Sequence, residues 1–150
     1  METKVKYEEV PIESIIPQRR PFIMVDKLLD VSENSADTEL LIGRDNIFVE
    51  NGCFVESGMI EHMAQTCAAG MGYVAIHSLQ DRVRIGFLSA IRGLRINRCP
   101  KVGEVLHTHI SIEEQFMGVV LVGAISSVGN EVVAEGKMKI FITETDENNP

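Results

Sequence analysis

The sequence contains no tryptophan, and aromatic residues make up only 5% of its 150 positions. It also has no apolar run approaching the ~20 residues that a helix needs to cross a bilayer. The first ten residues, METKVKYEEV, are charged and lack the apolar core of a secretory signal. We therefore expect a cytoplasmic protein without a membrane span.

Patterns that bind metals or build disulfide frameworks are missing as well. The three cysteines are an odd number without CxxC spacing, and the four histidines form neither HxxxH nor HExxH. We therefore expect no metal and no cofactor. Bases are in the minority, with 14 Lys and Arg against 22 Asp and Glu, and the net charge of −8 disfavours nucleic acid as a partner.

The chain has the size and composition of one domain. With 150 residues, 45% of them hydrophobic, it is long enough to bury a core of its own. We expect a single domain over residues 1–150, with residues 1–10 peripheral and residues 144–150 forming a disordered acidic tail.

One segment has the pattern of a long helix. In ESGMIEHMAQTCAAGMGYVAIHS, residues 56–78, apolar residues recur at helical spacing behind Ser57, which is a good N-cap. Small residues in its middle predict close packing against another element. Glu61 lies near the start of this apolar helix, with Gln65 one turn further on the same side. His62 points about 100° away from Glu61.

The rest of the chain alternates between strand-like segments and turns. Six segments with strand patterns are separated by turns such as SENS, CPKVG and Gly129-Asn130: residues 23–31, 36–42, 84–97, 104–116, 119–128 and 132–143. Asn51-Gly52 marks a further turn in the irregular approach to the helix. Alternation places His107 and His109 on the polar face of their strand. One helix and one large antiparallel sheet can bury their apolar faces against each other if the sheet curves around the helix. This order predicts an α+β hotdog fold with five to six strands.

Three stretches in the right order resemble the β-hydroxyacyl-acyl-carrier-protein dehydratases of the hotdog superfamily, of the FabZ kind. IPQRRPFIMVDKL, residues 16–28, looks like their opening LPHRxPFLLVDR, and EHMAQ, residues 61–65, looks like EAMAQ on their central helix. IGFLSAIRGLRINRCPKVGEVL, residues 85–106, is similar to their third strand and the turn after it. The nearest variety is the aryl-polyene-type branch.

The sequence departs from this family at two places that matter for the chemistry. Cys53 stands where the histidine of the loop before the helix would fall, and Gln18 stands where the aryl-polyene-like branch has its histidine in the opening motif. Both expected bases are therefore replaced, while Glu61 is retained. Dehydration needs a base for the α-proton and an acid for the departing hydroxyl.

The resemblance implies roles for particular residues. Glu61 would be acid or base, Gln18 would bind a carbonyl or hydroxyl oxygen, and the amides near Ser57 and Gly58 would form an oxyanion site. The other substrate-binding candidates are Cys53, Gln65 and five residues for an acyl tunnel: Phe22, Phe54, Met63, Phe87 and Leu88.

The resemblance also implies partners and leaves two other functions open. We expect a substrate carried as a thioester on acyl carrier protein or coenzyme A, and a homodimer or larger oligomer. Six bases without an acid between Arg82 and Lys101 would attract an acidic carrier or the phosphates of coenzyme A. Glu61 with Gln18 also fits a hotdog acyl thioesterase, and the replaced histidines fit a non-catalytic acyl-binding or auxiliary subunit.

Overall fold

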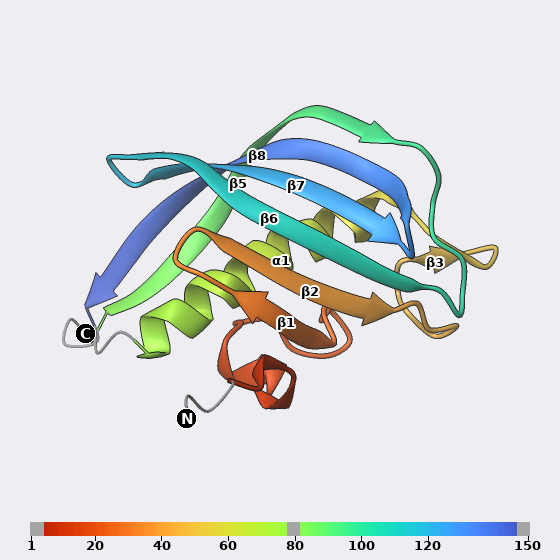
Figure 1. Ribbon diagram of the computed structural model, residues 1–150, viewed down its shortest axis with the longest axis horizontal. Helices are drawn as coiled ribbons and strands as arrows, with labels where there is room; N and C mark the ends of the chain where they lie inside the picture. The colour runs from red at the N-terminus through yellow and green to blue at the C-terminus, as the bar shows by residue number, and fades with distance from the viewer. Residues whose placement is uncertain (1–4, 78–81, 147–150) are drawn as a thin grey trace.

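A six-stranded antiparallel sheet curves around one long helix in the computed structural model, which describes residues 5–77 and 82–146 (Figure 1). The strand order in the sheet is β1-β2-β6-β7-β8-β5, so β1 and β5 are its edges. The predicted fold class and strand count are confirmed. The bounds are β1 Lys27–Val31, β2 Ser35–Leu41, β5 Arg82–Ile96, β6 Val105–Phe116, β7 Val119–Val128 and β8 Glu131–Asp146.

Helix α1 runs over Glu56–His77, close to the predicted span. Its first turn is closed by the Met59 amide, which donates to the carbonyl of Val55 at 3.1 Å. Ser57 is thus the second helical residue and lies exposed, so the prediction of Ser57 as the N-cap is wrong. The predicted end at Ser78 lies outside the described residues.

Small residues bring the middle of α1 close to two other parts of the chain. A Cβ atom added at Gly70 would lie 2.6 Å from the Cβ of Ala36 in β2. A Cβ atom at Gly72 would lie 2.0 Å from the carbonyl oxygen of Ile15. The predicted close packing of the helix is confirmed, against the sheet at one position and against the N-terminal region at the other.

The N-terminal region, which we call the strap, comprises residues 7–25 and packs on the helix beside β1. It contains two short 3-10 helices, η1 (Tyr7–Glu9) and η2 (Ile12–Ser14). A small apolar cluster joins the strap to β1 and the helix, through Ile12, Ile15, Ile16, Ile23, Val25, Leu28 and Ala69. The strap therefore shields a side of the helix that the sheet does not cover.

Every predicted strand except β7 differs from the structure at one or both ends, and the differences are largest in β1 and β8. β1 begins at Lys27 instead of residue 23, because the backbone of Met24 bonds to helix side chains instead of a neighbouring strand. β8 continues to Asp146, so residues 144–146 of the expected tail extend the strand, and residues 147–150 lie outside the described part.

The turns follow their sequence signals. Asn51 and Gly52 both have positive φ, 51° and 77°, and join the short strands β3 (Val49–Glu50) and β4 (Cys53–Phe54). Met117 and Gly118, with φ of 50° and 78°, make the corresponding turn between β6 and β7. Paired positive φ values suit two-residue hairpin loops, because their twist matches that of the strands.

The inner face of the sheet and the helix share the main core. In β6, Leu106, Thr108 and Ile110 are buried, while His107 and His109 alternate with them and are half-exposed. The larger core cluster includes Met59, Met63 and Cys67 of the helix. Among the described residues no helix is long and apolar enough to cross a membrane.

Candidate functional site

Gln65 connects the helix to the strap through both ends of its amide group. Its Nε2 donates to Glu61 Oε1 at 2.8 Å and to the carbonyl of Phe22 at 2.8 Å. Its Oε1 accepts from the Met24 amide at 2.6 Å. Gln65 is fully buried and Glu61 is half-buried. The carboxylate of Glu61 is therefore oriented by a side chain that is itself fixed by the strap backbone.

His62 lies on the buried side of the same helical turn. Its Nδ1 is 2.6 Å from the carbonyl oxygen of Met24, so Nδ1 carries the proton and donates. Burial lowers its pKa to about 4, an effect that the Met24 carbonyl opposes and that His107 slightly reinforces. The imidazole is thus neutral at pH 7. Its Nε2 is buried without a hydrogen-bond partner in the described structure.

Gln18 lies in the strap, four residues before Phe22. It is half-buried, and its Oε1 is buried without a hydrogen-bond partner among the described residues. The Gln18 carbonyl accepts from Arg19 Nη1 at 2.7 Å, and the same nitrogen donates to the carbonyl of Ile16 at 2.9 Å. The segment that carries Gln18 is therefore held locally by Arg19 and, further along, by Gln65.

The start of α1 presents backbone donors. Within the described residues, none accepts a hydrogen bond from the amides of Glu56, Ser57 or Gly58. Gly58 is buried, and a Cβ atom there would lie 2.6 Å from the Cβ of Phe48 and 2.7 Å from the ring of Phe54. A side chain at position 58 would therefore clash with Phe48 and Phe54, so glycine is needed there.

The cysteines lie in different environments. Cys53 is half-buried on β4 and forms an isolated β-bridge with Lys101. Burial raises the pKa of Cys67 to about 12. Burial also raises the pKa of Cys99, with smaller effects from Glu56 and Cys53. Cys67 and Cys99 therefore remain thiols at neutral pH and are poor nucleophiles.

The five residues predicted for an acyl tunnel divide into two groups. Phe54 and Met63 are buried in the core of the single chain. Phe22, Phe87 and Leu88 are exposed, to 58%, 57% and 39%. Phe87 and Leu88 belong to the edge strand β5, so they are open to contact with another chain.

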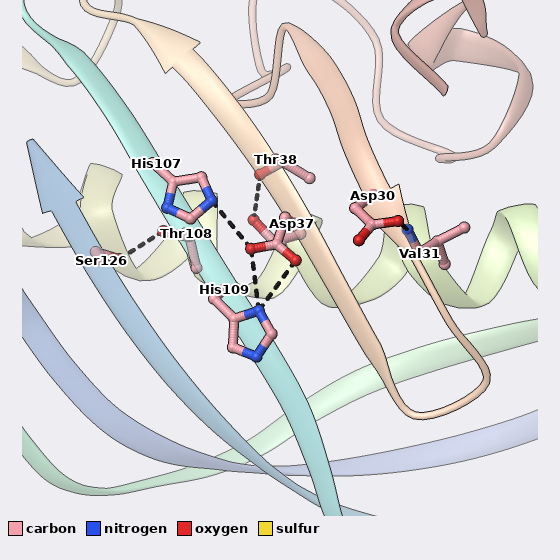
Figure 2. A network of polar contacts seen from close by, with 9 residues as sticks. Asp30, Val31, Asp37, Thr38, His107, Thr108, His109 and Ser126 are labelled. Carbon is pink, nitrogen blue, oxygen red and sulfur yellow. Dashed lines mark hydrogen bonds and ion pairs between the residues drawn. The ribbon is translucent and has the colours of Figure 1, made fainter. Parts of the chain in front are cut away.

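The two histidines of β6 lie on the outer face of the sheet with Asp37 of β2 (Figure 2). Asp37 Oδ1 is 3.0 Å from both His107 Nε2 and His109 Nδ1. Their neighbours Leu106, Thr108 and Ile110 point to the helix side, so the sheet separates both imidazoles from Glu61. His77 is stacked on Tyr73 at the far end of the helix. None of the four histidines is thus placed to act as a base beside Glu61 within one chain.

Two hollows lie away from these residues. One, of about 320 Å³, is between the second half of α1 and the sheet and is lined by Cys67, Met71 and Val120, among others. The other, of about 440 Å³, lies on the outer face near His109, Ser111 and Lys137. Neither hollow is lined by Glu61 or Gln18. We place the candidate site where the first turns of α1 meet the strap, because the hydrogen bonds of Gln65 and His62 converge there.

Part of the basic segment near β5 is neutralised by local ion pairs. Arg95 contacts Glu135 at 2.7 Å. Arg98 contacts Glu104 at 2.8 Å and Glu131 at 2.5 Å. The hydrogen bonds from the Arg98 guanidinium and, second, from the backbone amide of Lys101 lower the pKa of Glu104 to about 2. The attraction that this segment offers to an acidic partner is therefore weaker than its six bases suggest. In the described residues no group of three His, Cys, Asp or Glu side chains fits a metal ion.

The curved antiparallel sheet wrapped around one central helix defines a protein of the hotdog class. The family model described as ApeP dehydratase matches residues 10–149. The chain belongs to the ApeP-like dehydratase family.

Relatives agree with this assignment, and a solved structure shares the fold. The 3-hydroxyacyl-[acyl-carrier-protein] dehydratase FabZ of Rickettsia massiliae is 30% identical, over 86% of this chain and 91% of that protein. The FabZ of Solibacter usitatus is 27% identical, over 93% of this chain and 87% of that protein. A chain of the dehydratase heterocomplex ApeI:P from Xenorhabdus doucetiae has a TM-score of 0.80 at 20% identity, covering 89% of this chain and 91% of that one. The resemblance inferred from the sequence motifs is confirmed.

Sequence reasoning placed Glu61 and Gln65 on the same side of the helix, where they are hydrogen-bonded, but missed the bonds of Gln65 to Phe22 and Met24. The three-residue spacing of His62 and Gln65 places both on one buried side of the helix with Ala69. That spacing was the available signal for a shared role, but it does not identify Met24 as the common partner.

Proposed function

We propose that this chain is a β-hydroxyacyl-acyl-carrier-protein dehydratase-like protein that acts on acyl thioesters in fatty-acid or polyene-type synthesis. The observation that carries the proposal is the Glu61 carboxylate, held at 2.8 Å by a buried Gln65 that is itself bonded to the strap. Family membership and the FabZ relatives support the same activity.

In the proposed reaction the α-proton and the β-hydroxyl leave together as water and a carbon–carbon double bond forms. Glu61 serves as acid or base. The amide of Gln18 donates a hydrogen bond to the thioester carbonyl, whose oxygen gains charge as the α-proton departs. The free amides near Ser57 and Gly58 add to this stabilisation. Cys53 and Gln65 border the substrate, and the acyl chain runs along Phe22, Phe54, Met63, Phe87 and Leu88.

The proposed assembly is a homodimer joined through β5, with acyl carrier protein or coenzyme A delivering the substrate. β5 is a 15-residue edge strand, and it carries the exposed Phe87 and Leu88. A long edge strand with exposed apolar side chains favours pairing with another strand. A partner there would cover residues that the single chain leaves open.

The placement of the histidines favours a second candidate. With no imidazole beside Glu61 in one chain, a thioesterase that uses Glu61 and Gln18, or a non-catalytic acyl-binding or auxiliary subunit, fits the same residues. In another form of the auxiliary role, a different hotdog chain would supply the catalytic base and this chain would assist it.

Incubation with 3-hydroxyacyl thioesters of both carriers, followed by mass spectrometry, separates these functions. We expect loss of one water from the substrate with the native protein and none with Glu61→Gln. Glu13→Gln, an exposed residue of η2, serves as the control and should retain activity. Release of free acid would identify a thioesterase, and an unchanged substrate would leave the auxiliary role.

A further inference from the structure

Among the described residues, the side chain of His62 makes a single hydrogen bond, and its partner lies in the strap. Its Nδ1 donates to the Met24 carbonyl at 2.6 Å, while its Nε2 has no partner in the described structure. The side chain is completely buried. A buried, unpaired nitrogen opposes folding, so an apolar side chain would suit this place better if packing were its only purpose.

The residue that His62 holds is also held by Gln65. The amide of Met24 donates to Gln65 Oε1 at 2.6 Å, so both backbone polar groups of Met24 are bonded to side chains of one helical turn. Gln65 holds Phe22 as well. Because β1 starts only at Lys27, the backbone polar groups of Met24 are held by helix side chains and not by a neighbouring strand.

The same turn carries Glu61, and the same strap carries Gln18. We propose that His62 is a positioning residue, which fixes the strap and its Gln18 relative to Glu61 by anchoring the Met24 carbonyl. The proposal rests on the proposed function of Glu61 and Gln18. His62 does not touch the substrate, because its only free nitrogen is buried.

Two substitutions separate the hydrogen bond from the packing. His62→Leu removes the hydrogen-bond donor. His62→Asn keeps one, because the side-chain NH₂ group of asparagine lies near the position of the histidine Nδ1. Thr66→Val is the matched control, because Thr66 is fully buried one turn away and bonds to Thr38 and the His62 carbonyl but not to the strap.

The first measurement is amide hydrogen exchange of residues 18–24 in the protein without substrate. His62→Leu should speed exchange of the Met24 amide about tenfold, because the loss of one buried hydrogen bond loosens the strap. His62→Asn should restore most of the protection, and Thr66→Val should leave this segment as in the native protein. Unchanged exchange in His62→Leu would overturn the proposal.

The second measurement is the kinetics of dehydration. His62→Leu should lower kcat about tenfold at nearly constant KM, with His62→Asn close to native, because misplacing Gln18 weakens an interaction of the transition state. Faster exchange with an unchanged kcat would show that the strap position does not matter, and would overturn the proposal. If the native protein itself shows no turnover, the proposed function fails, and the exchange experiment alone decides whether His62 anchors the strap.

Discussion

At Gln65, one side-chain amide bonds to three partners that lie in two parts of the chain. Glu61 is four residues earlier on the helix, whereas Phe22 and Met24 are 43 and 41 residues away along the sequence. Glutamine suits this place because it offers two donors and an acceptor in fixed geometry. A glutamate here would repel the Glu61 carboxylate and could not donate to Phe22, so the amide is needed for both contacts.

The stability of the protein should depend on pH through His62. The imidazole binds a proton near pH 6.5 in the unfolded chain but only near pH 4 in the folded one. Between these values the unfolded state holds more protons, so stability falls as the pH falls. The shift corresponds to a loss of about 3 kcal/mol in the free energy of unfolding, fully developed below pH 4.

Urea unfolding at pH 7, 5.5 and 4.5 measures this effect. The difference between the native protein and His62→Asn removes the contribution of carboxylates that titrate in the same range. We expect the native protein to lose stability relative to the variant as the pH is lowered. Parallel curves for the two proteins would show that His62 does not carry the effect.

At the scale of elements, the backbone of the strap packs directly against the backbone of the helix at Gly72. A Cβ atom there would lie 2.0 Å from the carbonyl oxygen of Ile15, which belongs to the backbone and cannot rotate away. Tyr7 of the strap also packs edge-to-face on Tyr73, with ring centroids 5.2 Å apart. The strap therefore packs on the helix through complementary surfaces.

Gly72→Ala should destabilise the protein by about 2 kcal/mol, because overpacking against the strap outweighs the roughly 1 kcal/mol that alanine adds to helix propensity. Chemical denaturation gives the value. Gly43→Ala is the control, because nothing lies within 4 Å of a Cβ atom there. A stabilised Gly72→Ala would mean that the strap moves away at little cost.

At the scale of the whole molecule, the most important feature is the edge of the sheet that β5 forms. β5 pairs with β8 on one side, and its other side is open in the single chain. Exposed aromatic residues occur both on this strand and elsewhere, with Phe87 57% exposed on β5 and Phe116 76% exposed beside the β6–β7 turn. Exposure alone therefore does not identify the interface, and the edge must be tested separately.

Phe87→Lys should convert the proposed dimer to a monomer, since a charge on an edge strand disfavours pairing with another strand. Phe116→Lys introduces the same charge away from the edge and should leave the dimer intact. Sedimentation equilibrium measures the mass of each. A native protein that is monomeric, or a Phe87→Lys variant that remains dimeric, would exclude β5 as the interface.

The strands were predictable where local signals define them. The predicted bounds of β7 match the structure, because glycine-containing turns at Met117-Gly118 and Gly129-Asn130 end it on both sides. β1 was predicted four residues too long. The pattern of residues 23–26 resembles a strand, but tertiary bonds to His62 and Gln65 withdraw Met24 from the sheet.

The sequence by itself determined the helix, the succession of helix and strands along the chain, the family and the presence of Glu61 in its motif, because periodicity, turn residues and motif spacing are local properties. Only the tertiary structure decided which groups surround Glu61. Helical spacing shows that His62 and Gln65 share a buried side, but their common partner lies 38 and 41 residues away. Folding brings that partner to them, since packing of the strap on the helix depends on both segments at once.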